Sequence, residues 1–205
     1  MNGQPQVVDF WFDPLCPWAW LASRWLLAVE QVRPVRTCFH VMSLDILDEE
    51  SVEQPAGYRE KPQAGWIGVR AAIGVELQHG PLGLRDFYTA LGTRYHLRGE
   101  PKGNIDVVRA ALAECGFDPA IADAAADGAW DAELRASHHA GMDPVGQDVG
   151  TPVLHINGKA MFGPVISPAP KGEQAGLLFD GVSLVTATDG FFELKRSRDH
   201  GPIFD

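Results

Sequence analysis

The sequence has few basic residues, and this scarcity limits the partners that the protein can bind. Its 205 residues include 17 Lys and Arg against 27 Asp and Glu, which gives a formal net charge of −10. The only basic cluster, Lys195, Arg196 and Arg198, is short. Because proteins that bind nucleic acids neutralise phosphates with extended basic surfaces, we expect no nucleic-acid partner.

Long hydrophobic runs are also missing. A transmembrane helix needs about 20 apolar residues, whereas the longest candidate, residues 18–29, is interrupted by Ser23 and Arg24. Residues 1–6 are polar and lack the cationic start and the cleavage-site pattern of a signal peptide. We therefore expect a cytoplasmic protein without a membrane partner.

Cysteine is scarce, with three residues in the chain. A chain of this length buries roughly 70% of the surface that its unfolded form exposes, so its core does not need disulfides. In the cytoplasm an odd number of cysteines suggests reactive or inert thiols rather than a structural framework. Glycine-rich nucleotide motifs and the G-x-S-x-G motif are absent, so we expect no tightly bound cofactor.

The N-terminal part of the chain predicts a β-α-β unit. Residues 7–12 are β-branched and aromatic, as in a buried strand, and residues 35–42 alternate as in a second strand. Between them, apolar residues recur at helical spacing over residues 18–29, after Pro17, which is favoured at the first helical position. This arrangement predicts two parallel strands joined by a right-handed crossover, with Cys16 at the helix N-terminus.

The middle of the chain, residues 56–142, has a helical pattern throughout. Asn104 is expected to cap a helix that Gly116 ends, and Asp118 with Pro119 is expected to open another. A last helix is expected to close at Gly141. We interpret residues 56–142 as an inserted all-helical subdomain.

Strand patterns return after the helices. Residues 153–156 and 159–162 flank Asn157-Gly158, a strong signal for a type I′ hairpin turn. Residues 171–198 are expected to form two further helices. A β-α-β unit, a helical insertion, a Thr-Pro dipeptide with a hairpin and a final helix follow in the order of an α/β thioredoxin-like fold. Residues 1–55 and 143–205 would form this thioredoxin-like domain.

The segment Cys16-Pro17-Trp18-Ala19 occupies the start of the first helix, where unpaired backbone N–H groups and the helix dipole stabilise a thiolate. A fall of the thiol pKa from about 8.5 to about 6.5 would raise the thiolate fraction at pH 7 from roughly 3% to roughly three quarters. We therefore expect Cys16 to be a catalytic nucleophile with a lowered pKa.

The same fold places a Thr-Pro bond opposite that cysteine, and Thr151-Pro152 has the corresponding position in the sequence. We predict that this peptide bond is cis. It would turn the backbone of Thr151 towards Cys16, where it could position an extended substrate or a small thiol.

Six blocks of the sequence carry a more specific resemblance. They are Asp9–Trp18 (DFWFDPLCPW), Phe39–Leu44 (FHVMSL), Ser137–Asp143 (SHHAGMD), Asp148–Pro152 (DVGTP), Phe162–Val165 (FGPV) and Phe191–Arg196 (FFELKR). Through them, the sequence from about Val7 to Asp205 resembles the actinobacterial DsbA-like proteins typified by the mycothiol-dependent nitroreductase. The resemblance implies a thioredoxin-like fold of the DsbA type with an inserted helical subdomain.

The resemblance also implies an activity. It points to a cytoplasmic oxidoreductase of disulfides and nitroaromatic compounds, whose cysteine exchanges with mycothiol or another low-molecular-weight thiol as co-substrate. The substrate cleft would be shaped by Trp18 and Tyr58. Asp48 stands where the family is expected to have an asparagine, and His96 where a histidine is expected. Members of such families are often dimers, so a homodimer is the expected assembly.

The sequence departs from the family at one important position. Dithiol members carry Cys-Pro-Trp-Cys, whereas this chain has Ala19 in the fourth place. Alanine cannot resolve a mixed disulfide, so Cys16 must act as a monothiol that an external thiol such as mycothiol releases.

Two other functions remain open at this level. Related isomerases and kappa-class transferases use a DsbA-like fold to activate a cofactor thiol without a redox change, and a single residue at the helix start suits them. A redox-inactive binding module that kept the fold is the third possibility. Consumption of thiol and the pKa of Cys16 would separate the three.

The remaining cysteines and a histidine pair have ordinary structural interpretations. Cys38 lies in a predicted strand and Cys115 near a helix end, so we expect both to be structural. His138 and His139 are adjacent, whereas helical metal pairs prefer a spacing of four. We expect packing or capping roles for them and no metal site.

Overall fold

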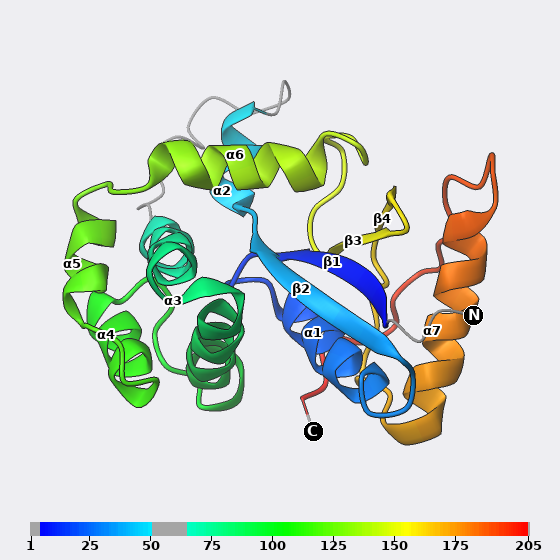
Figure 1. Ribbon diagram of the computed structural model, residues 1–205, viewed down its shortest axis with the longest axis horizontal. Coiled ribbons are helices and arrows are strands. Elements are labelled where there is room, and N and C mark those ends of the chain that lie inside the picture. Colours follow the sequence, from blue (N-terminus) through cyan, green and yellow to red (C-terminus); the bar gives the residue numbers. More distant parts are fainter. Residues whose placement is uncertain (1–4, 51–64, 205) are drawn as a thin grey trace.

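The computed structural model describes residues 5–50 and 65–204, and its centre is a four-stranded sheet with the strand order β2-β1-β3-β4 (Figure 1). Strands β1 and β2 are parallel, while β3 is antiparallel to β1, and β4 to β3. The β-α-β unit and the later hairpin are therefore confirmed. The strands are β1 (Gln6–Phe12), β2 (Val35–Val41), β3 (Val153–Ile156) and β4 (Lys159–Phe162).

Helices separate and follow these strands. Within residues 5–50 and 65–204, no helix is both long and apolar enough to cross a membrane. Helix α3 is interrupted at Gly80, which has a non-helical φ of 73° and is followed by Pro81. The helices are α1 (Pro17–Val29), α2 (Leu44–Glu50), α3 (Trp66–Gly92), the π-helix η2 (Thr93–Leu97), α4 (Ile105–Glu114), α5 (Ala120–Ala126), α6 (Asp131–Met142) and α7 (Gly172–Ala187).

Alternation along β1 builds the main core. Val8, Phe10 and Phe12 point to one face of the sheet and are fully buried there. On this face, Tyr88 of α3 stacks on Phe12 with ring centroids 3.7 Å apart. Burying side chains of this size contributes about 1.5–3 kcal/mol each. The core on this face joins the sheet to α1 and to the inserted helix α3.

The opposite face of the sheet is centred on Trp11. Its indole lies between His40 and His155, with ring centroids 4.5 and 4.2 Å away, and its Nε1–H donates to the carbonyl of Ser137 at 2.9 Å. Helix α6 covers this face. The prediction that Gly141 ends α6 is wrong, because α6 continues to Met142. Gly141 instead lies against the Trp11 ring, where a Cβ would come within 2.4 Å of the indole.

Local capping signals in the inserted helices are confirmed. Asn104 Oδ1 accepts a hydrogen bond from the backbone N–H of Asp106 at 2.8 Å and caps α4. Asp118 Oδ1 accepts from the N–H of Ala120 at 2.9 Å at the start of α5. Gly116 follows α4 with a φ of 73°. These short-range interactions depend on neighbouring residues only, and so their sequence signals are reliable.

The hairpin turn is also as predicted. Asn157 and Gly158 have φ values of 53° and 79°, which a type I′ turn requires at both central positions. This turn sets the register in which Ile156 pairs with Lys159.

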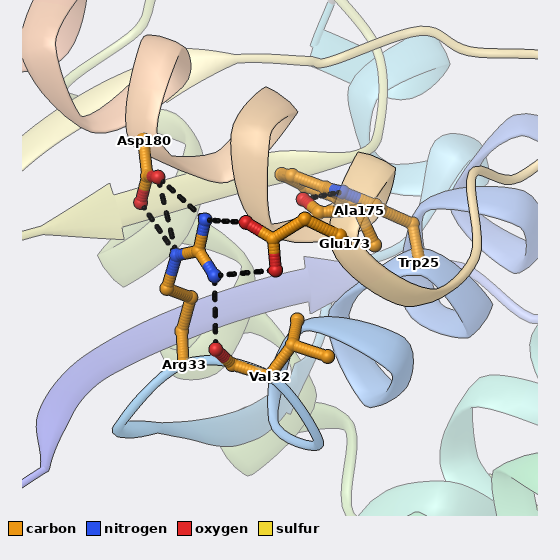
Figure 2. A network of polar contacts seen from close by, with 6 residues as sticks. All are labelled: Trp25, Val32, Arg33, Glu173, Ala175 and Asp180. Atoms are coloured by element: carbon orange, nitrogen blue, oxygen red, sulfur yellow. Dashed lines mark hydrogen bonds and ion pairs between the residues drawn. The ribbon is translucent and has the colours of Figure 1, made fainter.

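A charged cluster attaches helix α7 to the turn that follows α1 (Figure 2). The guanidinium of Arg33 binds the carboxylate of Glu173 at 2.7 Å and that of Asp180 at 2.8 Å. Beside it, Trp25 Nε1–H donates to the carbonyl of Ala175 at 3.0 Å. These contacts fix α7 beside α1, on the same face of the sheet.

The prediction of two helices over residues 171–198 is half wrong. Helix α7 ends at Ala187, and residues 191–198 have no regular structure. Gly190 adopts a φ of 78°, and Phe192 and Leu194 beyond it are 87% and 85% exposed. With no buried apolar face to pack, this segment gains nothing from helix formation. Further on, Phe204 returns to the core against His96.

Helices α3 to α6 lie between β2 and β3 in the sequence and form a group beside and above the sheet (Figure 1). They share one continuous hydrophobic core with the sheet. The division into residues 1–55 with 143–205 and an insert of residues 56–142 stays a prediction.

The contact between Gly141 and Trp11 predicts the effect of a small substitution. Gly141→Ala should lower the free energy of unfolding by about 1–3 kcal/mol, because the new methyl group overlaps the indole. Gly181→Ala in α7 is the matched control, since no atom lies within 4 Å of its Cβ position. That variant should be stabilised by about 0.5–1 kcal/mol. Urea denaturation measures both, and equal shifts would contradict the packing argument.

Candidate active site

The turn between β1 and α1 carries Cys16. Cys16 is the N-cap of α1, and its Sγ accepts a hydrogen bond from the backbone N–H of Ala19 at 3.5 Å. The N–H of Cys16 itself donates to the carbonyl of Asp13 at 3.0 Å. Pro17 occupies the first helical position, as predicted. The sulfur therefore lies at the helix start, beside the unpaired N–H groups of the first turn.

The loop before β3 meets this sulfur. The Thr151–Pro152 peptide bond is cis, as predicted, and the Cys16 thiol donates to the carbonyl oxygen of Thr151 at 3.3 Å. The Thr151 hydroxyl donates to the carbonyl of Trp11 at 2.8 Å, which ties the loop to β1. The structure thus brings together Cys16, Thr151 and Pro152.

Burial of the thiol reverses the expected pKa shift. Cys16 is only 7% exposed, and this burial raises its pKa, an effect to which the nearby charge of Asp13 adds. The N–H of Ala19 and the ammonium of Lys102 act in the opposite direction but do not prevail. Desolvation disfavours the thiolate more than the helix N-terminus favours it. The expected fall in pKa is therefore wrong for this resting structure, in which Cys16 is a thiol.

Asp13 is a site residue that the sequence pattern did not indicate. Its carboxylate is 1% exposed and accepts two backbone hydrogen bonds, from the N–H of Leu15 at 2.8 Å and from the N–H of Leu44 at 2.8 Å. Burial raises its pKa to about 7. In the sequence, Asp13-Pro14 indicates only a strand end, because the second partner of Asp13 lies 31 residues away.

His96 is brought to the same turn, but it contacts the backbone rather than the thiol. Its Nε2–H donates to the carbonyl of Pro14 at 2.9 Å, and its ring stacks on Trp20 with a centroid distance of 5.7 Å. Burial lowers the pKa of His96 to about 4, so its imidazole is neutral at pH 7. The carbonyl acceptor fixes the proton on Nε2. His96 therefore holds the turn in place.

Lys102 is a second residue that sequence analysis missed. It lies in the loop between η2 and α4, and its Nζ donates to the carbonyl oxygen of Leu15 at 2.8 Å. Nothing in the local sequence marks this contact, since a lysine in a polar loop is ordinary. Its importance comes from the position of Leu15 next to Cys16.

The other predicted site residues have different outcomes. Trp18 is half-buried, and the guanidinium of Arg198 lies 5.1 Å from its ring centre. Ala19 is fully buried in α1. Asp48 is exposed on α2 and makes no hydrogen bond or ion pair with Cys16, so the structure does not bring it to the thiol. Tyr58 lies outside the described residues.

The expected packing role is confirmed for His138, which is 1% exposed, whereas His139 is partly exposed and contacts carboxylates at the surface. His138 Nδ1 accepts from the N–H of Ser43 at 3.3 Å, and His139 forms an ion pair with Asp143 at 3.1 Å when it is protonated. In the part of the chain that is described, no three His, Cys, Asp or Glu side chains gather as a metal-binding group. Cys38 Sγ accepts a hydrogen bond from Arg36 at 3.0 Å within β2.

Comparison with known proteins gives a consistent set of relatives. The family profile described as "Rv2466c-like: Mycothiol-dependent nitroreductase Rv2466c" matches residues 15–196. An uncharacterised protein of Mycobacterium tuberculosis, Rv2286c, is 31% identical over 199 residues, which cover 96% of this chain and 84% of that protein.

Solved structures at low sequence identity show the same fold. A 2-hydroxychromene-2-carboxylate isomerase superposes with a TM-score of 0.58 at 13% identity, covering 87% of this chain and 95% of that one. The cytosolic disulfide reductase DsbM of Pseudomonas aeruginosa, solved with GSH, gives 0.55 at 17% identity, covering 86% and 98%. DsbA of Chlamydia trachomatis gives 0.58 at 9% identity, covering 92% and 91%. The chain therefore has the DsbA-type thioredoxin-like fold that was expected.

The raised pKa of Asp13 predicts a specific pH dependence of stability. The folded state holds the Asp13 proton up to about pH 7, whereas the carboxyl group of an unfolded chain loses its proton near pH 4. This group therefore stabilises the fold at pH 4 and below, and its contribution is lost as the pH rises to 7. The loss should be on the order of a few kcal/mol and should level off above pH 7.

Asp13→Asn should remove this component of the slope, because asparagine does not titrate. Urea denaturation between pH 4 and pH 8 measures the difference. Asp118→Asn, at an exposed helix cap, should keep the wild-type slope. An unchanged slope in Asp13→Asn would show that the Asp13 carboxyl is not the group responsible.

Proposed function

Because the chain belongs to the Rv2466c-like family of mycothiol-dependent nitroreductases, a family of thiol-dependent oxidoreductases, we propose that Cys16 is its monothiol nucleophile, with mycothiol or another low-molecular-weight thiol as reductant. One observation carries this proposal. The Cys16 sulfur lies at the start of α1, 3.3 Å from the carbonyl of Thr151, and alanine occupies position 19. We also propose that the protein acts in the cytoplasm and that it forms a homodimer.

Each group at the site has a role in the first step. When the thiol loses the proton that it shares with the Thr151 carbonyl, the N–H of Ala19 still donates to the sulfur. The carbonyl of Thr151 is then free to accept a hydrogen bond from substrate. Trp18, two residues after Cys16, offers an aromatic surface, which suits a nitroaromatic ring.

Disulfide reduction then proceeds by two exchanges. The Cys16 thiolate attacks one sulfur of the substrate disulfide, forms a mixed disulfide, and releases the other sulfur as a thiolate that takes up a proton. The thiolate of mycothiol next attacks the substrate sulfur of this mixed disulfide, and Cys16 leaves as a thiolate. Each turnover consumes one mycothiol and releases one substrate thiol in the first exchange. The second exchange releases a disulfide between mycothiol and the other half of the substrate.

Reduction of a nitro group needs two electrons and two protons for each nitroso group and water formed. Cys16 and one mycothiol supply them together and become a mixed disulfide. A second mycothiol attacks this disulfide at the mycothiol sulfur, restores Cys16 and forms mycothiol disulfide. Two thiols are consumed for each nitroso product, so the electrons balance without a second cysteine.

Cys16→Ser should lower the turnover of a model disulfide with mycothiol by a factor of about 1,000 or more, because a hydroxyl cannot replace a thiolate in exchange. Consumption of thiol and release of product thiol are measured together. Cys115→Ser, which alters a cysteine at the end of α4, is the matched control and should keep full activity.

Three outcomes separate the possible functions. Stoichiometric thiol consumption that Cys16→Ser abolishes supports the redox proposal. Turnover of a substrate that needs thiol without consuming it would contradict the proposal and favour an isomerase or transferase. Full binding of ligands by Cys16→Ser, with no thiol exchange in the wild type, would favour a binding module.

Ala19→Cys tests the monothiol route directly. In the wild type, a mixed disulfide between Cys16 and a small thiol should persist until a second thiol arrives. A cysteine at position 19 places a thiol one helical turn from Cys16 and should release the bound thiol. Intact-mass spectrometry measures the adduct, and Ala22→Cys, further along α1, should retain it. Equal adduct levels in the Ala19→Cys variant and the wild type would count against the proposed route.

A further inference from the structure

Lys102 contacts the peptide group that immediately precedes the Cys16 side chain. Its Nζ lies 2.8 Å from the carbonyl oxygen of Leu15, and this carbonyl forms one planar peptide group with the nitrogen of Cys16. Bond lengths alone keep the Cys16 sulfur within about 5 Å of that oxygen. The ammonium group therefore lies within about 8 Å of the reacting sulfur.

We propose that Lys102 is a positioning residue of the redox site, which holds the Leu15–Cys16 peptide group and offsets the negative charge that forms on the Cys16 sulfur during exchange. This inference rests on the proposed function, because it assigns a role within that reaction. It places a functional group of the site in the loop that precedes α4, outside the β1–α1 turn itself.

The hydrogen bonds around the turn show why a cation is effective there. The N–H of Leu15 donates to the Asp13 carboxylate, and the carbonyl of Leu15 accepts from Lys102 Nζ. The two peptide groups that flank Leu15 therefore cannot rotate freely. Cys16 and Asp13 both raise the pKa of Lys102, although burial, the larger effect, lowers it. Lys102 in turn lowers the pKa of Cys16. The attraction thus acts between the ammonium group and both acidic groups.

Arg198 lies over the Trp18 ring, but the charged side chains that act on the pKa of Cys16 are Asp13 and Lys102. His96 from η2 is neutral, and the buried hydroxyls of Tyr88 in α3 and Tyr95 in η2 have raised pKa values because of burial. Asp45, from α2, contributes a carboxyl group of the opposite sign, as does Asp13. Among the described residues, Lys102 makes no ion pair with a carboxylate that would neutralise it.

In the monothiol route, negative charge forms on Cys16 twice. It forms when the thiol loses its proton, and again when the external thiol displaces Cys16 from the mixed disulfide. A leaving thiol with a lower pKa leaves faster, so one cation assists both steps. At a separation of up to about 8 Å, we expect removal of the Lys102 charge to change the pKa of Cys16 by roughly half a unit to one unit.

The test compares Lys102→Met, Lys102→Gln and Lys102→Arg. The rate of alkylation of Cys16 is followed from pH 5 to pH 10 by mass spectrometry, which reports the thiol pKa without any turnover. Met and Gln should raise the pKa by roughly half a unit to one unit and slow alkylation at pH 7 by about 3- to 10-fold, whereas Arg should stay near the wild type. Lys159→Met, in the hairpin, removes the same charge elsewhere and should change neither value.

Steady-state kinetics give a second measurement. The Met and Gln variants should lower kcat for disulfide exchange more than they change KM, because Lys102 acts on the sulfur rather than on substrate. Circular dichroism establishes that each variant is folded. A folded Met or Gln variant with the wild-type pKa overturns the inference, and so does an Arg variant that shifts as far as Met.

These outcomes are distinct from those that test the proposed function. If Cys16→Ser keeps its turnover while the Met variant still shifts the alkylation profile, the redox function fails and the electrostatic contact remains. If Cys16→Ser is inactive and the Met variant has an unshifted profile, the function stands and the role of Lys102 fails.

Discussion

The Asp13 carboxylate is the constraint on which the geometry of the site depends. Its two oxygens accept from the N–H groups of Leu15 and Leu44, so one side chain joins the turn before α1 to the first residue of α2. The backbone carbonyl of Asp13 also accepts from the N–H of Cys16. A buried carboxylate is costly unless hydrogen bonds compensate for the lost water. Burial raises the pKa of the Asp13 carboxyl group to about 7. The hydrogen bonds of the same residue hold Cys16 in one position.

That position has a chemical consequence. The N–H of Ala19 and the ammonium of Lys102 favour a thiolate, while burial of the sulfur and the charge of Asp13 disfavour it. Burial prevails, so the resting site protects its thiol in the protonated form, hydrogen-bonded to Thr151. In the proposed mechanism, substrate displaces this hydrogen bond and so removes the acceptor of the thiol proton. This loss shifts the equilibrium of Cys16 from thiol towards thiolate.

The sequence alone predicts the features that depend on near neighbours. Pro17 after Cys16, the cap at Asn104 and the turn at Asn157-Gly158 act over a few residues, and each is found where expected. The features that it does not predict depend on distant partners. Lys102 is significant only because its loop folds against Leu15, 87 residues earlier. Gly141 has the local pattern of a helix end, but it lies within α6, where it packs against the Trp11 indole of strand β1. The pKa of Cys16 was predicted with the wrong sign for the same reason, since a helix N-terminus is visible in the sequence and the burial around it is not.

The surroundings of Ala19 restrict how an external thiol reaches Cys16. Ala19 is completely buried in α1, so the space that a second cysteine would fill is part of the core and admits no small molecule. Asp13 and Lys102 hold the two peptide groups on either side of Leu15 by hydrogen bonds. The cis Thr151–Pro152 bond lies beside the sulfur, and the half-buried ring of Trp18, over which Arg198 lies, is two residues further along the chain. In the proposed reaction, substrate and external thiol react at the Cys16 site in turn, because alanine at position 19 supplies no second sulfur. A monothiol enzyme can work in this way, because the first leaving group departs before the second thiol arrives.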